Sequence, residues 1–253
     1  MTQSLVVGNW KMNTLPSDAM ELTSKLEGNA SIVAAIKQHV GVVVCPPFTS
    51  LHAVRSVITS SKIHLGAQNC GREDSGAFTG EVSAPMLAAL GCTYVIVGHS
   101  ERRRDQFETN EIIGLKARHA RAHGLTPIVC IGETLDERQT NQTVEVLRAQ
   151  LDGIASTAGV ETLTESIFAY EPVWAIGTGQ SATVAQVQST HEDIHRHLRL
   201  AYGLEIRLLY GGSVTSSNAG ELLHLPGVGG ALVGGASLKP DQFAAIVAAA
   251  VRE

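Results

Sequence analysis

The stretch Ser166-Ile-Phe-Ala-Tyr-Glu-Pro-Val-Trp-Ala-Ile-Gly-Thr-Gly179 joins a short apolar run to a carboxylate and a glycine-containing loop. The run Ser166–Tyr170 is apolar almost throughout instead of alternating, which is typical of a parallel strand covered on both faces. Pro172 disfavours helix at the preceding residue, so we expect Glu171 to be held extended at the strand end. The stretch therefore predicts a buried parallel strand with an acidic side chain at its carboxyl end.

The loop after this strand has the composition of a lid. Gly177 and Gly179 permit backbone conformations closed to other residues, so the backbone can approach a ligand closely. Val173, Trp174 and Ile176 make the loop apolar, as a cover that excludes water must be. We predict a lid with an exposed tryptophan at its tip.

Seven further apolar runs recur along the chain: Leu5–Asn9, Gly41–Cys45, Ile63–Ala67, Tyr94–Val97, Pro127–Ile131, Ile206–Tyr210 and Ala231–Val233. Helical sequence lies between them, most clearly at Asp18–Leu26, Ser83–Leu90, Ile112–His123, Val184–Tyr202 and Asp241–Val251. Eight strands that each precede helical sequence, in a chain of this length, predict an α/β fold, the (β/α)8 barrel, as one domain over residues 1–253. A doubly wound sheet also alternates, but its glycine signature after the first strand is missing.

Composition excludes several classes of protein. The chain has 253 residues, 44% hydrophobic and 17% charged, with a net charge of −5 and no long run of either sign. These values argue against nucleic acid or an anionic membrane surface as the main partner. No secretory leader is recognisable, and the apolar run Phe243–Val251 is too short to span a bilayer, so we expect a cytoplasmic protein. The four cysteines lie far apart, and Cys45 and Cys130 are expected to be small buried side chains.

Ligands of a parallel barrel bind at the carboxyl ends of the strands, and this rule selects the candidate site residues. The polar residues and glycines that follow predicted strands are Asn9, Lys11, His99, Glu101, Glu171, Ser213, Gly234 and Gly235. We therefore expect one rim to bring together residues that are remote in sequence.

The rim carries groups suited to proton transfer. His99 lies where a helix begins, so free N–H groups there are expected to donate to its ring and keep the imidazole neutral. Glu171 supplies a carboxylate base, and Lys11 supplies a cation for a developing oxyanion. Such a set, under a lid, fits proton abstraction next to a carbonyl.

Two glycine turns favour a phosphorylated substrate. Gly211-Gly212-Ser213 and Gly234-Gly235 each follow an apolar run, and a short helix is expected to begin at the second turn. Backbone N–H groups in such turns can point at an anion, and the lid N–H near Gly177 would complete the cradle.

A competing motif is His191-Glu-Asp-Ile-His195, which matches the His-Glu-x-x-His pattern of zinc peptidases. Charged side chains surround it, so we interpret the motif as the solvated face of an outer helix. His119 and His123 have the same spacing and the same interpretation. No histidine, cysteine or aspartate cluster at the strand ends suits a metal, and no metal site is expected.

Six motifs together closely resemble those of the triosephosphate isomerase family. They are Gly-Asn-Trp-Lys-Met-Asn at 8–13, Gly-Ala-Phe-Thr-Gly-Glu at 76–81, Val-Gly-His-Ser-Glu-Arg-Arg at 97–103, Ala-Tyr-Glu-Pro-Val-Trp-Ala-Ile-Gly-Thr-Gly at 169–179, Tyr-Gly-Gly-Ser-Val at 210–214 and Val-Gly-Gly-Ala-Ser-Leu at 233–238. The resemblance covers nearly the full length. It implies a TIM barrel that interconverts dihydroxyacetone phosphate and D-glyceraldehyde 3-phosphate, in glycolysis and gluconeogenesis, without a cofactor.

The resemblance also assigns roles in that reaction. Glu171 would move the proton between two carbons through an enediolate, with His99 as electrophile. Lys11 would be the cation, and Asn9 would help to position the oxygens. Ser100 would hold Glu171 in the open state, and Glu101 would support Lys11. Phosphate would be bound by Gly177, Ser213, Gly234 and Gly235.

The family resemblance further implies a homodimer, with a loop like Cys70–Gly80 beside the partner's site and Thr79 reaching toward it. The chain departs from the family pattern at Gln180, where a basic residue is frequent, and at Gly229, where an aspartate is common. Two other functions remain open at this point. Metal ligands at the strand ends would favour a phosphosugar epimerase, and loss of Lys11, His99 or Glu171 would favour a silent scaffold; the sequence shows neither.

Overall fold

The computed structural model describes residues 4–58, 62–176 and 181–252. Its eight strands are β1 (Leu5–Asn9), β2 (Gly41–Cys45), β3 (Ile63–Ala67), β4 (Tyr94–Val97), β5 (Thr126–Ile131), β6 (Ile167–Tyr170), β7 (Leu208–Tyr210) and β8 (Gly230–Val233). All neighbouring strands are parallel, and β1 pairs with both β2 and β8, which closes the sheet into a barrel. The predicted fold is confirmed, and each predicted run overlaps one strand, with ends that differ by two residues at most.

The barrel strands are apolar on both faces because each face has its own core. Leu5 and Val7 of β1 point into the barrel, where they pack with Cys45 and Cys130. Val6, between them, points outward and packs in the larger core beneath the helices. The two cysteines are fully buried and free, as expected of small hydrophobic side chains. This double burial explains why the strand sequences do not alternate between polar and apolar residues.

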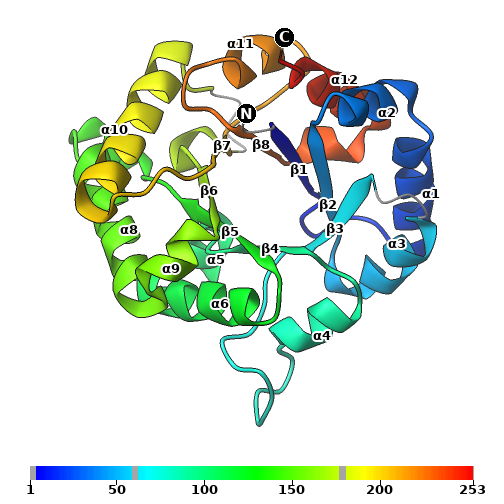
Figure 1. Ribbon diagram of the computed structural model, residues 1–253, viewed down its shortest axis with the longest axis horizontal. Helices are drawn as coiled ribbons and strands as arrows, with labels where there is room; N and C mark the ends of the chain where they lie inside the picture. Colours follow the sequence, from blue (N-terminus) through cyan, green and yellow to red (C-terminus); the bar gives the residue numbers. More distant parts are fainter. Residues whose placement is uncertain (1–3, 59–61, 177–180, 253) are drawn as a thin grey trace.

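Helices form a ring outside the barrel (Figure 1). The α-helices are α1 (Pro16–Glu27), α2 (Ala30–Lys37), α3 (Leu51–Val57), α4 (Ala84–Ala89), α5 (Ser100–Asp105), α6 (Asn110–Ala122), α7 (Leu135–Gln139), α8 (Thr143–Ala158), α9 (Val160–Thr164), α10 (Val184–Tyr202), α11 (Ala219–Leu223) and α12 (Pro240–Ala249). Three short 3-10 helices are η1 (Phe48–Ser50), η2 (Val173–Ala175) and η3 (Gly235–Leu238). None of the helices in the described ranges is long and apolar enough to cross a membrane.

The five helices predicted from the sequence are present as α1, α4, α6, α10 and α12. The sixteen-residue helix α8 was not predicted. Its N-cap Gln142 makes no side-chain capping bond, and Gly153 in its interior lowers helix propensity. The structure shows why that glycine is present: a Cβ atom at Gly153 would lie 2.9 Å from the Cβ atom of Asn110 on α6. The close approach of the two helices therefore requires a residue that sequence reasoning treats as a helix breaker.

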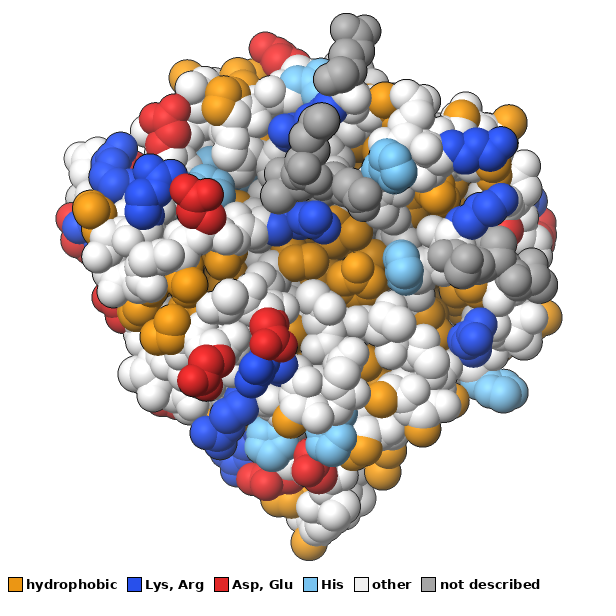
Figure 2. Space-filling view, in the orientation of Figure 1, with side chains coloured by type: hydrophobic (Ala, Val, Ile, Leu, Met, Phe, Trp, Pro, Cys, Tyr) orange, Lys and Arg blue, Asp and Glu red, His pale blue; other side chains and the backbone are white. Residues whose placement is uncertain are grey.

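The long loop between β3 and α4 extends beyond the ring of helices (Figure 1). Asp74 in this loop contacts α6, because its Oδ1 atom lies 3.0 Å from Nδ1 of His119 and 2.8 Å from Nε2 of His123. Figure 2 shows histidine and acidic side chains together where the loop joins the body. The two histidines predicted to be a solvated face are thus half-buried and hold this loop to its neighbouring helix.

Candidate active site

A cavity of about 500 Å3 lies at the carboxyl ends of the barrel strands. Seven of the predicted residues line it: Asn9, Lys11, His99, Glu171, Ser213, Gly234 and Gly235. Gly177 lies outside the described residues. Thr79 is exposed on the protruding loop and does not line this cavity. Closure of the barrel therefore brings the ends of β1, β4, β6, β7 and β8 together as the strand-end rule predicts.

Glu171 follows β6 and is 2% exposed. Its N–H group donates to the carbonyl oxygen of Ile131 at 2.8 Å, which continues the pairing with β5. Gly132 makes this approach possible, because a Cβ atom there would overlap the carbonyl oxygen of Glu171. The carboxylate lies 2.9 Å from Nε2 of His99 and accepts the N–H of Ser100 at 2.8 Å. Burial alone raises the pKa of Glu171, but the imidazole and this N–H outweigh burial and lower the pKa.

His99 is the N-cap of α5, and the N–H of Glu101 donates to its Nδ1 atom at 3.3 Å. This bond leaves the ring proton on Nε2, directed at Glu171, so the expected donation from the helix start is present. The direction of the pKa shift differs from the expectation, however. Burial lowers the pKa of His99, but the adjacent Glu171 carboxylate raises it more, and the net shift is upward. The sequence could not show that the two side chains are in direct contact.

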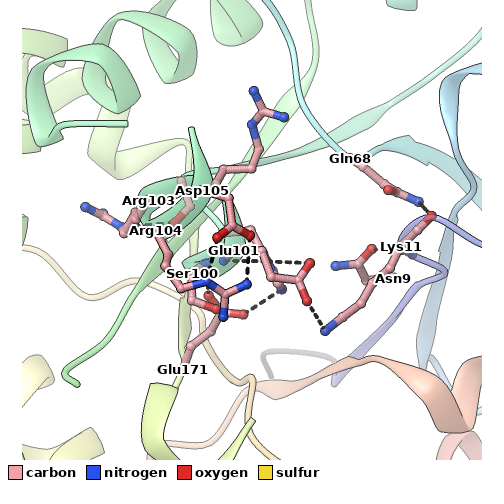
Figure 3. Close-up of polar contacts among 12 residues, drawn as sticks. Asn9, Lys11, Gln68, Ser100, Glu101, Arg103, Arg104, Asp105 and Glu171 are labelled. Atoms are coloured by element: carbon pink, nitrogen blue, oxygen red, sulfur yellow. Dashed lines mark hydrogen bonds and ion pairs between the residues drawn. The ribbon is translucent and has the colours of Figure 1, made fainter. Parts of the chain in front are cut away.

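Lys11 has a positive φ of 51°, which is uncommon for a residue with a side chain. Two contacts hold this backbone: its N–H donates to Oδ1 of Asn9 at 3.0 Å, and its carbonyl oxygen accepts from Gln68 at 2.9 Å. The side chain is held by a third, from Nζ to Glu101 at 2.7 Å. Figure 3 shows the side chains of Lys11 and Glu101 pointing toward each other. The ammonium group lies 4.0 Å from the position a Cβ atom at Gly234 would occupy, so the cation faces the glycine turn after β8.

The two glycine turns line the same cavity. At Gly211 a Cβ atom would lie 2.9 Å from Cγ of Glu171. A residue with a side chain at this position would therefore displace Glu171, whereas glycine leaves room for it. The turn after β8 opens into η3, where the N–H of Ser237 donates to the carbonyl oxygen of Gly234 at 2.8 Å. Nothing lies within 4 Å of a Cβ atom built on Gly235. The short helix predicted at this turn is present, with open space in front of its first residue.

The described part of the predicted lid, residues 173–176, is held in place by Trp174. Trp174 lies in η2 and is half-buried, whereas the sequence analysis predicted that it is exposed at the tip of a loop. Its Nε1 atom donates to the buried carboxylate of Glu133 at 2.9 Å, and the guanidinium of Arg138 lies 5.5 Å from its ring centre. Residues 177–180, which include the glycines of the predicted lid, lie outside the described ranges.

The His-Glu-x-x-His motif lies on α10, but part of our interpretation is wrong. His191 is fully buried, packed edge-on against Tyr170 with ring centres 5.9 Å apart. Burial lowers its pKa to about 3. Nδ1 of His191 and Nε2 of His195 both lie near the carbonyl oxygen of Gly227, at 3.2 and 2.9 Å. One histidine of the motif, His191, therefore points into the protein instead of into solvent. Within the described ranges, no three histidine, cysteine or acidic side chains are grouped to hold a metal.

Three residues near the cavity were missed by the sequence analysis. Gln68 bonds the backbone of Lys11, and Glu133 bonds Trp174 and the hydroxyl of Tyr170. Arg103 braces the start of α5 through the carbonyl oxygens of Gly98 and Cys130. Gln68 directly follows β3 and Glu133 closely follows β5, so the strand-end rule could have found both. Nothing in the sequence distinguishes Arg103 from the basic residues beside it.

Fold and site together define a class. The molecule is a (β/α)8-barrel enzyme whose cavity combines a carboxylate, an imidazole and an ammonium group with two glycine turns.

Comparison with known proteins identifies the family. The family model described as triosephosphate isomerase matches residues 4–250. Similar curated proteins include the triosephosphate isomerases of Prosthecochloris aestuarii, 46% identical with 99% of each chain covered, and of Herminiimonas arsenicoxydans, 45% identical with 99% of this chain and 100% of the relative covered. That of Thiobacillus denitrificans is 45% identical over the whole of both chains. The chain belongs to the triosephosphate isomerase family, and it is an isomerase.

Proposed function

We propose that the protein interconverts dihydroxyacetone phosphate and D-glyceraldehyde 3-phosphate, in glycolysis and gluconeogenesis, as one catalytic domain in the cytoplasm. The single observation that carries this proposal is the position of Glu171. Its carboxylate is 2% exposed, ionised by its neighbours and directed into a cavity that also holds His99 and Lys11. A buried carboxylate in this setting is a base for a carbon acid, and the family match supplies the substrate class.

The reaction follows from the contacts of Glu171 and His99. Glu171 leaves His99 and takes a proton from the carbon beside the carbonyl group; the C–H electrons form the enediolate and its oxygen takes the negative charge. His99 donates its Nε2 proton to that oxygen and recovers a proton from the neighbouring hydroxyl. The carboxylate then returns its proton to the adjacent carbon, so no proton or electron is gained or lost. Once Glu171 has moved to the substrate, the contact that raises the pKa of His99 is gone, which favours the neutral ring.

Lys11 and the glycine turns are proposed to bind the rest of the substrate. The ammonium group faces Gly234, so one cation lies near both the developing oxyanion and the phosphate. N–H groups of Ser213, Gly234 and Gly235 would cradle the phosphate oxygens, together with the lid at Gly177. Ser100 would hold Glu171 in the open state, and Asn9 would position the substrate oxygens. This scheme needs no metal and no organic cofactor.

We further propose a homodimer. Five large apolar side chains are exposed on segments that follow the adjacent strands β1 to β4: Met12, Leu15, Phe48, Phe78 and Phe107. Exposed large apolar side chains after neighbouring strands favour association, here with a second copy whose Thr79 would approach Lys11. Light scattering behind size exclusion is expected to give about twice the chain mass, and a monomer at micromolar concentration would contradict the dimer.

A coupled assay with both triose phosphates tests the proposed function directly. We expect conversion in both directions, undiminished in EDTA. Absence of conversion of either substrate would reject the reaction, and full inhibition by EDTA that zinc or iron reverses would reject the metal-free mechanism.

A further inference from the structure

The cavity contains a second ammonium group that the site residues above do not include. Lys239 lies between η3 and α12, is exposed and lines the same cavity as Gly234 and Gly235. Its N–H donates to the carbonyl oxygen of Ala236 at 3.2 Å, so the turn that presents the glycine amides also fixes the backbone of Lys239. Lys239 is therefore tied to the wall where the phosphate is proposed to bind.

The charges of the cavity show what Lys239 adds. Without Lys239 the cavity would carry one net negative charge when His99 is neutral, because Glu101 at 2.7 Å neutralises Lys11 and the Glu171 carboxylate is left over. A phosphate dianion entering such a cavity would be repelled. Among residues 4–58, 62–176 and 181–252, Lys239 makes no ion pair and no side-chain hydrogen bond, so its charge is available to offset that repulsion.

We infer that Lys239 is a positioning residue that attracts the phosphate group on approach and retains it against the glycine turns. This inference rests on the proposed function. An exposed cation acts through a screened field, so it changes the rate of encounter and KM more than the chemical step. Lys11 differs from Lys239 because it is fixed by Glu101 and by the side chain of Asn9 beside the reacting groups.

The test compares Lys239→Gln with Lys37→Gln, which removes the same charge elsewhere. Lys37 is an exposed residue at the end of α2, shortly before the amino end of β2, and it does not line the cavity. At low ionic strength we expect Lys239→Gln to lower kcat/KM for D-glyceraldehyde 3-phosphate roughly three- to tenfold, with kcat within about twofold. The salt dependence of kcat/KM should weaken in Lys239→Gln alone, and Lys239→Arg should restore both.

Unphosphorylated D-glyceraldehyde separates attraction of phosphate from a structural role. Its kcat/KM should be the same in the unsubstituted protein and in Lys239→Gln, whereas inorganic phosphate should inhibit Lys239→Gln roughly three- to tenfold less strongly. The inference would be overturned if Lys239→Gln and Lys37→Gln were active and had the same kcat/KM for D-glyceraldehyde 3-phosphate. It would also be overturned if Lys239→Gln lowered kcat/KM for D-glyceraldehyde as much as for the phosphorylated substrate. An unsubstituted protein inactive on both triose phosphates would instead reject the proposed function and the inference with it.

Discussion

Two buried carboxylates contact α5 and have different kinds of partner. Glu171 contacts the start of the helix, where its partners are the His99 ring and the N–H of Ser100. Glu108 contacts the side of the same helix, where Arg102 and Lys116 each donate to its Oε1 atom at 2.6 Å. Both side chains are almost fully buried, at 2% and 4% exposed.

The difference separates a reactive site from a structural one. Two cations, Arg102 and Lys116, hold Glu108 in one position because both donate to the same carboxylate oxygen. The partners of Glu171 are a titratable ring and one amide, so its carboxylate can leave them and accept a proton at moderate cost. Burial of a carboxylate alone therefore does not indicate catalysis; the nature of its partners does.

The largest expected effect is on activity. Glu171→Gln keeps the shape of the side chain but removes the base, so we expect kcat to fall roughly 10²- to 10⁴-fold. The melting temperature should stay within a few degrees, because the amide can still bond Ser100. Steady-state kinetics and calorimetry on the same sample measure both values. Turnover near that of the unsubstituted protein would contradict the assignment of Glu171.

At Glu108 the comparison predicts a loss of stability instead. Glu108→Gln leaves the ammonium of Lys116 buried beside a neutral amide, with Asn69 at 2.8 Å as its remaining partner. We expect the free energy of unfolding to fall by about 3–5 kcal/mol, measured by urea denaturation. The double variant Glu108→Gln with Lys116→Met should lose less than the single one. If the double variant is the less stable of the two, the buried pair is not the cause.

The pKa of His99 gives a sharper test of the contact with Glu171. Because Glu171 raises it, His99 should titrate above its usual value of 6.5 in the ligand-free protein. In Glu171→Gln, burial and Lys11 still lower the pKa of His99, and only the weaker field of Glu101 still raises it. The pKa of His99 should therefore fall below 6.5. NMR titration of the ring nitrogens measures this. His64 at the other end of the barrel, whose pKa is lowered by burial, serves as control and should not move.

The smallest effect is expected at the half-exposed pair of Lys11 and Glu101. Their side chains are 29% and 39% exposed, so solvent screens the attraction. Glu101→Gln should change the free energy of unfolding by less than about 1 kcal/mol. If Glu101→Gln lowered the free energy of unfolding as much as Glu108→Gln, solvent exposure would not be the reason that the two ion pairs differ in their contribution to stability.

Sequence reasoning recovered the barrel because its strands are buried on both faces and leave a plain apolar signal. The strand-end rule placed remote residues on one rim without any knowledge of their contacts, and seven of them line one cavity in the structure. Helix α8 was missed because Gly153 serves packing against α6, which no local pattern reveals.

Contacts between distant side chains were beyond the sequence. The pairing of Glu171 with His99, which reverses the expected shift of the imidazole pKa, joins β6 to the end of β4. The burial of His191 and of Trp174 likewise depends on tertiary neighbours, Tyr170 and Glu133. Residue types at strand ends were predictable, whereas their protonation and orientation required the fold.

The central claim is that Glu171 carries a proton between two carbons by way of an enediolate. The most direct measurement is isomerisation of dihydroxyacetone phosphate in deuterium oxide, with the product analysed by NMR. We predict deuterium at carbon two of D-glyceraldehyde 3-phosphate, because a carboxylate-bound proton exchanges with solvent. Product formed at the normal rate with no deuterium at that carbon would indicate hydride migration and contradict the account.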